Sequence, residues 1–287
     1  MTGRFLYLML PAVLPGLCAT GTSFGESLSP SGQLLVVASA ETRGQIAPCN
    51  CPALPLGGLP RRASLLRDVE STVAHHVFVE LGEVFPAAAD PADLPLWART
   101  MGAAYGRMGY DVVVLGDEDA SLGPEVLRTF REAFMRERPL GFVVSDSGGG
   151  GFQTVRLRKG DLDILCVVLW ADCDVEALRP VLEENGDPAD LTLGILHGSL
   201  LNAQDLAETL PPMDILLTAD GAHLEELLWV GSTPIAGPGT QGRRLAFLRF
   251  PESAPGPPAA YLLVDVGPQI ESDPAMSDLL SLLPAGE

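Results

Sequence analysis

Short runs of apolar, largely β-branched residues recur along the chain, and segments typical of helices separate most of them. Runs of this length, bounded by glycine and polar residues, are typical of buried strands. The predicted strands are 34–38, 77–81, 112–115, 142–144, 191–196 and 215–217, and the predicted helices are 60–69, 91–108, 123–137, 175–184 and 203–210. Nearly continuous apolar strands that alternate with helices indicate sheets buried between helical layers. The sequence therefore predicts an α/β fold.

The remaining segments fit one domain with antiparallel additions. Residues 154–169 read as a hairpin that turns at Lys159-Gly160, and 245–250 and 261–266 read as late strands. No internal repeat and no strong boundary divides the body. The expected organisation is a segment of residues 1–24, one α/β domain over 25–270, and a C-terminal tail over 271–287.

The N-terminal segment has the features of a secretory signal peptide. Arg4 precedes an almost entirely apolar run over 5–18, and small residues follow at 19–23. This run is shorter than the roughly 20 residues that a membrane-spanning helix needs. Cys18 follows Leu17 rather than a small residue, which disfavours lipid anchoring. We expect an exported protein, periplasmic or secreted, and the alternative is a hydrophobic N-terminus on a cytoplasmic protein.

The charge balance excludes one class of partner. The chain has 18 basic and 37 acidic side chains, a formal charge of −19, and Lys159 is its only lysine. Binding to nucleic acid depends on clustered positive charge that neutralises phosphates. No such cluster is visible in the sequence, so we expect no nucleic-acid partner.

Polar residues follow several predicted strands, where an α/β sheet collects its ligands. Glu41 and Arg43 follow the first strand, and Glu83 follows the second. Later strands are followed by Asp117, Glu118, His197, Asp220 and His223. The carboxyl ends of these strands therefore form the candidate site.

In order and spacing, these segments resemble the calcineurin-like metallophosphoesterase superfamily, in particular the N-terminal catalytic domain of UshA-like 5'-nucleotidases. The stretch from Gly57 through Arg61 and Arg62 resembles the family's Gly-Gly-Leu-Ala-Arg helix start. The resemblance covers about residues 33–266, without the nucleotidase C-terminal domain. It implies a four-layer sandwich of two mixed β-sheets flanked by helices.

The resemblance also implies a dinuclear metal site, and most of its ligand positions are replaced here. Only His197 keeps the family's residue type. Glu41 and Glu83 stand for aspartates, Arg43 for a histidine, Asp117 and Glu118 for Asn-His, and Asp220 for the first residue of the last pair. His223 lies one position out of register with the second residue of that pair.

Two interpretations of this site remain. Glu41, Glu83, Asp117, Glu118 and Asp220 could hold a hard cation such as Ca²⁺ or Mg²⁺ through their oxygens. Alternatively, Arg43 forms ion pairs with these carboxylates and the site is a remnant, with Arg43 and His223 on its wall. The second interpretation is favoured because a guanidinium cannot be deprotonated to admit a dication. We therefore assign no cofactor, with a divalent metal ion as the alternative, and we expect no hydrolysis by the family mechanism.

Cys49 and Cys51 are separated by one residue and flanked by prolines. This segment resembles the Pro-Cys-Gly-Cys segment of a bacterial UshA-like subgroup with eroded metal motifs, in which selenocysteine is sometimes reported. We predict that Cys49 and Cys51 are redox-active, with Arg43, Arg61 and Arg62 favouring the thiolate. The alternative is that they pair with Cys166 and Cys173 as ordinary staples of an exported protein.

Three functions are compatible with this sequence. The favoured one is an exported metallophosphoesterase-like protein that acts through its Cys-Asn-Cys loop or by binding. The second is a working metal-dependent phosphoesterase with a carboxylate-rich site, and the third is a structural module with another envelope protein as partner. No specific partner can be named from the residues.

Overall fold

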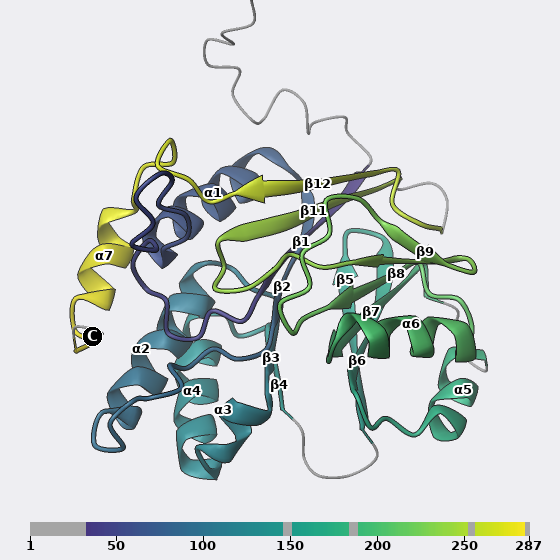
Figure 1. Cartoon of the computed structure of the whole chain (residues 1–287), viewed down its shortest axis with the longest axis horizontal. Coiled ribbons are helices and arrows are strands. Elements are labelled where there is room, and N and C mark those ends of the chain that lie inside the picture. The colour runs from purple at the N-terminus through teal and green to yellow at the C-terminus, as the bar shows by residue number, and fades with distance from the viewer. Residues whose placement is uncertain (1–32, 146–150, 184–188, 252–255, 285–287) are drawn as a thin grey trace, which may run out of the picture.

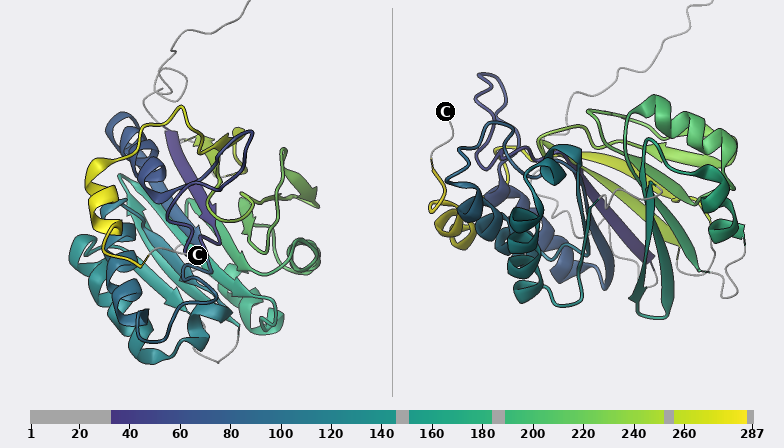
Figure 2. Two further views of the ribbon diagram at one scale, coloured as in Figure 1. Left: turned by 60° about the vertical axis from the view of Figure 1, so that its left-hand side comes forward. Right: turned by 90° about the horizontal axis from the view of Figure 1, so that it is seen from below.

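Two β-sheets stack face to face, and helices cover both outer surfaces (Figures 1 and 2). The computed structural model describes residues 33–145, 151–183, 189–251 and 256–284. The predicted α/β class and the four-layer sandwich are confirmed. The predicted signal peptide (1–24) and Cys18 lie outside the described residues.

The first sheet has six strands in the order β12-β11-β1-β2-β3-β4. Its strands are β1 (Gln33–Ala40), β2 (His75–Leu81), β3 (Val112–Leu115), β4 (Phe142–Ser145), β11 (Arg244–Pro251) and β12 (Ala260–Asp265). The strands β1 to β4 are parallel, while β11 pairs antiparallel with β1 and β12 pairs antiparallel with β11. Parallel pairing places the carboxyl ends of β1, β2 and β3 at the same edge.

The second sheet has six strands in the order β5-β6-β7-β8-β10-β9. Its strands are β5 (Phe152–Lys159), β6 (Leu162–Trp170), β7 (Leu191–His197), β8 (Ile215–Thr218), β9 (Leu228–Val230) and β10 (Thr233–Ala236). The hairpin predicted over 154–169 is formed by β5 and β6, with Lys159 opposite Leu162. The strands β6, β7, β8 and β10 are parallel.

The helices lie close to their predicted positions. They are α1 (Leu59–Thr72), α2 (Leu94–Arg107), α3 (Asp117–Ser121), α4 (Pro124–Glu137), α5 (Val175–Glu183), α6 (Leu200–Thr209) and α7 (Pro274–Leu280). Proline stands in the first turn of α1, α2 and α4, where its missing N–H removes no helical hydrogen bond. The short helix α3 was not predicted.

Three apolar clusters hold the layers together. One lies between the first sheet and its helices, a second between the two sheets, and a third between the second sheet and α5 and α6. Alternate residues of β1 serve two of them, since Leu35 and Val37 face the helices while Leu34 and Val36 face the other sheet. Because both faces of this strand are buried, residues 34–38 are continuously apolar rather than alternating.

The C-terminal residues include a packed helix. Met276 and Leu280 of α7, with Leu283 after it, are buried in the helix-side cluster. Asp273 caps the helix by accepting a hydrogen bond from Met276 N at 2.7 Å. Within the stretch 271–287 that was expected as a tail, Met276, Leu280 and Leu283 therefore contribute to the core. Within the described ranges, every helix is too short or too polar to cross a bilayer.

Candidate functional site

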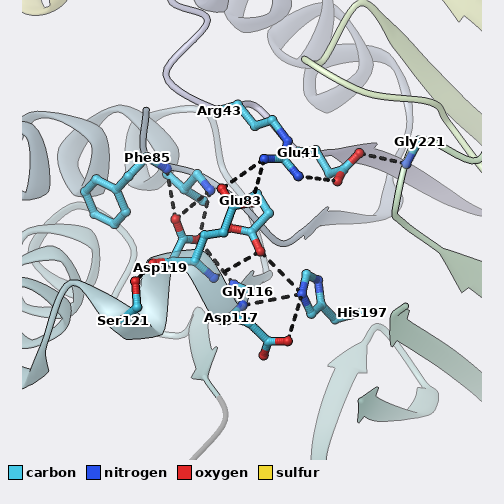
Figure 3. Close-up of polar contacts among 12 residues, drawn as sticks. Glu41, Arg43, Glu83, Phe85, Gly116, Asp117, Asp119, Ser121, His197 and Gly221 are labelled. Carbon is cyan, nitrogen blue, oxygen red and sulfur yellow. Dashed lines mark hydrogen bonds and ion pairs between the residues drawn. The ribbon is translucent and has the colours of Figure 1, made fainter. Parts of the chain in front are cut away.

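The candidate site lies where the carboxyl ends of strands from both sheets meet (Figure 3). The loops after β1, β2 and β3 supply side chains from the first sheet, and β7 and the loop after β8 face them from the second. The residues brought together are Glu41, Arg43, Glu83, Asp117, Glu118 and His197, with the backbone of Gly221. The predicted gathering at this edge is therefore observed for most of the predicted residues.

Arg43 joins two carboxylates, that of Glu41 on its own loop and that of Glu118 in α3. Its Nη2 lies 3.0 Å from Glu41 Oε1, and its Nη1 lies 3.1 and 2.9 Å from the two oxygens of Glu118. Although burial opposes the charged form, the hydrogen bonds to Glu41 and Glu118 raise the pKa of Arg43. A permanent cation thus occupies the space between these carboxylates.

The other oxygen of Glu41 is also engaged. Glu41 Oε2 accepts a hydrogen bond from Gly221 N at 2.8 Å, and the Glu41 side chain is buried. Asp220, the residue predicted at this position, is exposed. The backbone N–H of its neighbour Gly221, rather than the Asp220 carboxylate, contacts Glu41. The acceptor capacity of Glu41 is therefore used within the protein.

Glu83 and His197 form the second half of the site. Glu83 Oε1 lies 3.4 Å from His197 Nε2 and accepts a hydrogen bond from Glu118 N at 3.3 Å. Asp117 Oδ2 lies 3.8 Å from the same imidazole nitrogen. Burial raises the pKa of the Glu83 carboxyl. Glu83 Oε2 and His197 Nδ1 are buried without a hydrogen-bond partner among the described residues.

The backbone of these loops is unusual. Glu41, Arg43, Glu83 and Asp220 have φ between 46° and 53°. Gln241 has φ of 59° and donates its N–H to Glu41 O at 2.8 Å. A non-glycine residue in this left-handed region costs about 1–2 kcal/mol. In the described chain, every non-glycine residue with positive φ belongs to this edge, and concentrated strain of this kind is typical of functional sites.

Asp119 was not singled out from the sequence as a site residue. Its buried carboxylate accepts hydrogen bonds from Val84 N at 2.8 Å, Phe85 N at 3.0 Å and Gly116 N at 3.2 Å. Burial raises its pKa to about 7, against the effect of these donors. The carboxylate ties the loop after β2 to the start of α3. Its position in the first turn of that helix was the only available signal.

Arg62 lies beneath the site rather than on its wall. Its side chain is fully buried, and Nη1 lies 3.2 Å from Glu80 Oε2 and within 3.5 Å of the Tyr105 and Tyr110 hydroxyls. Ser39 and Thr42 donate hydrogen bonds to the Glu80 carboxylate. The charge of Arg62 is therefore paired with Glu80. The prediction that Arg62 favours a thiolate at Cys49 or Cys51 is not supported by this position.

Cys49 and Cys51 form a disulfide, with Cα atoms 5.4 Å apart. Cys49 is buried, and its Sγ lies 3.3 Å from Leu56 N, while Cys51 is half-buried. Arg61 donates to Pro55 O at 2.7 Å and so braces the same loop. The alternative pairing with Cys166 and Cys173 is wrong, because both are free thiols. Burial raises the pKa of each of those thiols.

His223 lies outside the cluster. It is exposed, with Nε2 at 3.0 Å from Glu225 Oε1 and 3.1 Å from Arg244 Nη1. Its one-residue offset from the family register thus corresponds to a different environment, beside the start of β11.

The donor set does not fit the dinuclear metal centre that the resemblance implies. Arg43 pairs with both Glu41 and Glu118. Asp117 is exposed and lies 3.8 Å from His197, so Glu83 and His197 are the two buried donors that remain. Among the described residues, no group of three or more His, Cys, Asp or Glu side chains is arranged to hold a metal ion. The contacts instead describe a polar network in which Arg43 pairs with two of the carboxylates.

Comparison with known proteins gives matches among solved structures. No protein-family model and no curated protein matches the chain. The sulfate thiohydrolase SoxB of Thermus thermophilus is similar with a TM-score of 0.72 at 15% identity, over 88% of this chain and 60% of that one. A 5'-nucleotidase precursor from the same organism has a TM-score of 0.68 at 14% identity, over 87% and 58% of the two chains.

A shorter relative is covered almost completely. The calcineurin-like phosphoesterase YfkN of Bacillus subtilis matches with a TM-score of 0.58 at 12% identity, over 88% of this chain and 96% of that one. By contrast, this chain spans about three fifths of the SoxB and nucleotidase structures. The two six-stranded sheets, the helical outer layers and these similarities together show that the chain has the fold of the metallophosphoesterase domain of UshA-like 5'-nucleotidases.

Proposed function

We propose that this protein is a thiol–disulfide-active member of the metallophosphoesterase fold that does not hydrolyse phosphoesters. The observation that carries the proposal is the Arg43 guanidinium held between Glu41 and Glu118, where the resemblance expects metal ligands. Hydrolysis in this fold depends on metal ions that activate water and neutralise the phosphoryl oxygens. With that role replaced by an internal ion pair, the Cys49–Cys51 disulfide is the remaining reactive group on the loop after β1.

The surroundings of the two sulfurs favour one direction of exchange. Cys51 is half-buried and Cys49 is buried, so an incoming thiolate reaches the Cys51 sulfur more readily. Its attack forms a mixed disulfide, breaks the Cys49–Cys51 bond, and leaves the electron pair on Cys49 Sγ. The N–H of Leu56, 3.3 Å from that sulfur, stabilises the departing thiolate. A second thiol of the reductant then attacks the mixed disulfide, which leaves Cys51 reduced and the reductant oxidised.

A structural role alone explains the bond poorly. In the chain-entropy account, a disulfide stabilises a protein more when it closes a longer loop. Cys49 and Cys51 are two positions apart, so their bond constrains very little of the unfolded chain. Chemistry at the sulfurs is the better reason for such a pair.

The redox proposal is tested by the reduction potential of the pair and by single-cysteine variants. We expect a potential near or above about −270 mV, the value of a thioredoxin, and a value below about −300 mV would mark a structural bond. Cys49→Ser should form a mixed disulfide with oxidised glutathione at Cys51 much faster than Cys51→Ser does at Cys49. The matched control is Cys173→Ser, which should leave both the potential and the rates unchanged.

A metal-dependent phosphoesterase is the second candidate, favoured by the unpartnered Glu83 Oε2 and His197 Nδ1 and by the strained loops. We expect no hydrolysis of nitrophenyl phosphate with added Mn²⁺ and no Mn²⁺ binding by calorimetry. Arg43→Ala, which frees Glu41 and Glu118, should gain Mn²⁺ affinity. Metal-dependent hydrolysis by the wild type that Glu83→Ala abolishes would establish the second candidate instead.

We also propose export, on the charge and apolar pattern of residues 1–24. An oxidising compartment outside the cytoplasm is consistent with a Cys49–Cys51 disulfide. Amino-terminal sequencing of the protein recovered from the periplasm or the medium should give a mature end near residue 25. An intact Met1 on protein recovered from the cytoplasm would contradict export.

A further inference from the structure

A cavity opens at the end of the sandwich opposite the candidate site. Its volume is about 470 Å³, and it lies where the edge strands of the two sheets, β4 and β5, meet the end of α4. Asp111 on its wall directly precedes β3, whereas Asp117 of the candidate site follows β3. The four residues of β3 separate the two regions by about 13 Å along the strand. A volume of this size is typical of small-ligand sites.

The cavity collects positive charge on a strongly acidic chain. Its lining includes Arg138, Arg156, Arg158 and Lys159, against the acidic Asp111 and Glu137. The whole chain carries a formal charge of −19. Four of its 18 basic side chains at one cavity, among them its only lysine, are far more than an even distribution would place there.

These charges are only partly compensated, and Arg156 is among the paired ones, with its Nη1 2.5 Å from Asp163 Oδ2. Arg138 Nη2 and Lys159 Nζ both lie 2.8 Å from the same oxygen, Asp111 Oδ1, so one carboxylate faces two cations. The Asp111 side chain is buried and also accepts from Phe78 N at 3.1 Å, which fixes its position. Glu137 is taken by Arg107 at 3.4 Å. No hydrogen bond or ion pair joins Arg158 to another described residue.

Apolar side chains complete the lining. Leu140 is 86% exposed and Phe142 is 39% exposed, and both lie beside the cationic groups. Exposed large apolar residues at a concave surface are characteristic of ligand-binding sites. A ligand that complements this lining needs an anionic group for the cationic side chains and an apolar body for Leu140 and Phe142.

We propose that this cavity binds a small amphipathic anion, an apolar chain or ring that carries a single carboxylate or phosphate. The excess cationic charge, with Arg158 as the uncommitted donor, holds the anionic group, and Leu140 and Phe142 cover the apolar part. The proposal does not depend on the thiol chemistry at Cys49 and Cys51, which belongs to a loop at the opposite end of β1 to β3. Loss of either function would leave the other intact.

The test is calorimetric titration of the full chain with octanoate, octyl phosphate and the uncharged octanol. We expect one octanoate or octyl phosphate per chain, at least tenfold tighter than octanol, with affinity that falls as salt is added. The better of the two anions identifies the headgroup class. Equal affinity for octanol, or no binding of either anion, would overturn the proposal.

Two variants assign the binding to this cavity. Arg158→Ala should weaken anion binding about tenfold, the effect of losing one charge-assisted hydrogen bond, and Arg158→Lys should recover part of it. The exposed Arg128→Ala on α4, which does not line the cavity, is the matched control and should bind as the wild type does. Wild-type affinity in Arg158→Ala would place the anion elsewhere and refute the assignment.

Discussion

Arg62 and Glu80 form an ion pair with both side chains fully buried, and they connect α1 to β2. The pair is embedded in hydroxyl groups, which supply the hydrogen bonds that a buried carboxylate needs. Arg62 Nε and Nη2 nevertheless have no hydrogen-bond partner among the described residues. Removing one partner of such a pair leaves the other charge buried and uncompensated.

We therefore predict that Arg62→Met lowers the free energy of unfolding by about 3–5 kcal/mol, measured by urea denaturation. A double variant that also replaces Glu80 by Leu should recover part of the loss, since no buried charge remains. Arg128→Met, whose ion pairs with Glu125 and Glu132 are exposed, is the control and should keep the wild-type midpoint. Wild-type stability in Arg62→Met would mean that water reaches the pair.

Asp119 predicts a specific pH dependence. Its folded pKa of about 7 lies above the value near 3.9 that it takes when unfolded, so the folded state keeps its proton over this interval. The unfolded state then binds fewer protons, and the free energy of unfolding falls as pH rises from about 4 to about 7. The contribution of Asp119 is complete below that window and lost above it.

Asp119→Asn should remove this part of the slope when Tm is measured between pH 4 and 8. The amide also places an N–H₂ group against backbone donors of Val84 or Gly116, so the variant should be less stable throughout. Asp117→Asn, in the exposed part of the same helix, should retain the wild-type slope. An unchanged slope in Asp119→Asn would show that the carboxylate is ionised across the whole range.

At the scale of elements, α2 and α4 approach each other closely at a glycine. A Cβ atom at Gly102 would collide with the backbone oxygen of Phe130 and lie 3.0 Å from the Ala133 side chain. Alanine normally stabilises a helix by about 1 kcal/mol relative to glycine. Here the added methyl group meets backbone, which cannot rotate away.

The expected effect of Gly102→Ala is thus reversed in sign, a loss of about 1–2 kcal/mol in the free energy of unfolding. Ala103→Gly, at the next position on the same helix, should lose about 1 kcal/mol through the ordinary helix preference. If Gly102→Ala proved more stable than the wild type in thermal melts, α2 and α4 would have to be further apart than described.

At the scale of the whole molecule, the cluster between the two sheets joins both halves. Val36 and Val79 of the first sheet and Ile195 and Leu217 of the second share it, so neither sheet buries its inner face without the other. The candidate site depends on the same stacking, because Glu83 comes from the first sheet and His197 from the second. Separation of the sheets would expose the inner face of each sheet and would part Glu83 from His197.

We predict that the two sheets unfold together. Trp97 lies in the helix-side cluster and Trp170 in the cluster between the sheets. Two variants, one with Trp97 and the other with Trp170 as its only tryptophan and Trp229 replaced in both, should give coincident fluorescence transitions in guanidinium. Far-ultraviolet circular dichroism provides the control for total secondary structure. Two separate midpoints would show that the layers are independent units.

Most strands, most helices and the α/β class follow from the sequence alone, whereas the short strands β9 and β10 were not predicted. Residues of β1 and β3 are apolar on both faces, a pattern that only a sheet covered on both sides satisfies. The replacement of metal ligands was also readable, because Arg43 and Glu118 differ in residue type from the pattern that they resemble. Such properties belong to single residues or to neighbours along the chain.

Tertiary structure alone decided which groups meet. The spacing of the cysteines does not reveal whether Cys49 pairs with Cys51 or with a distant thiol. Nor does the sequence reveal that Arg62 pairs with Glu80 rather than lying beside the cysteine loop. The same holds for Asp119, for the packing of α7, and for the cationic cavity at the opposite edge. These contacts join residues far apart in the chain, and their partners are fixed only when the layers stack and exclude water.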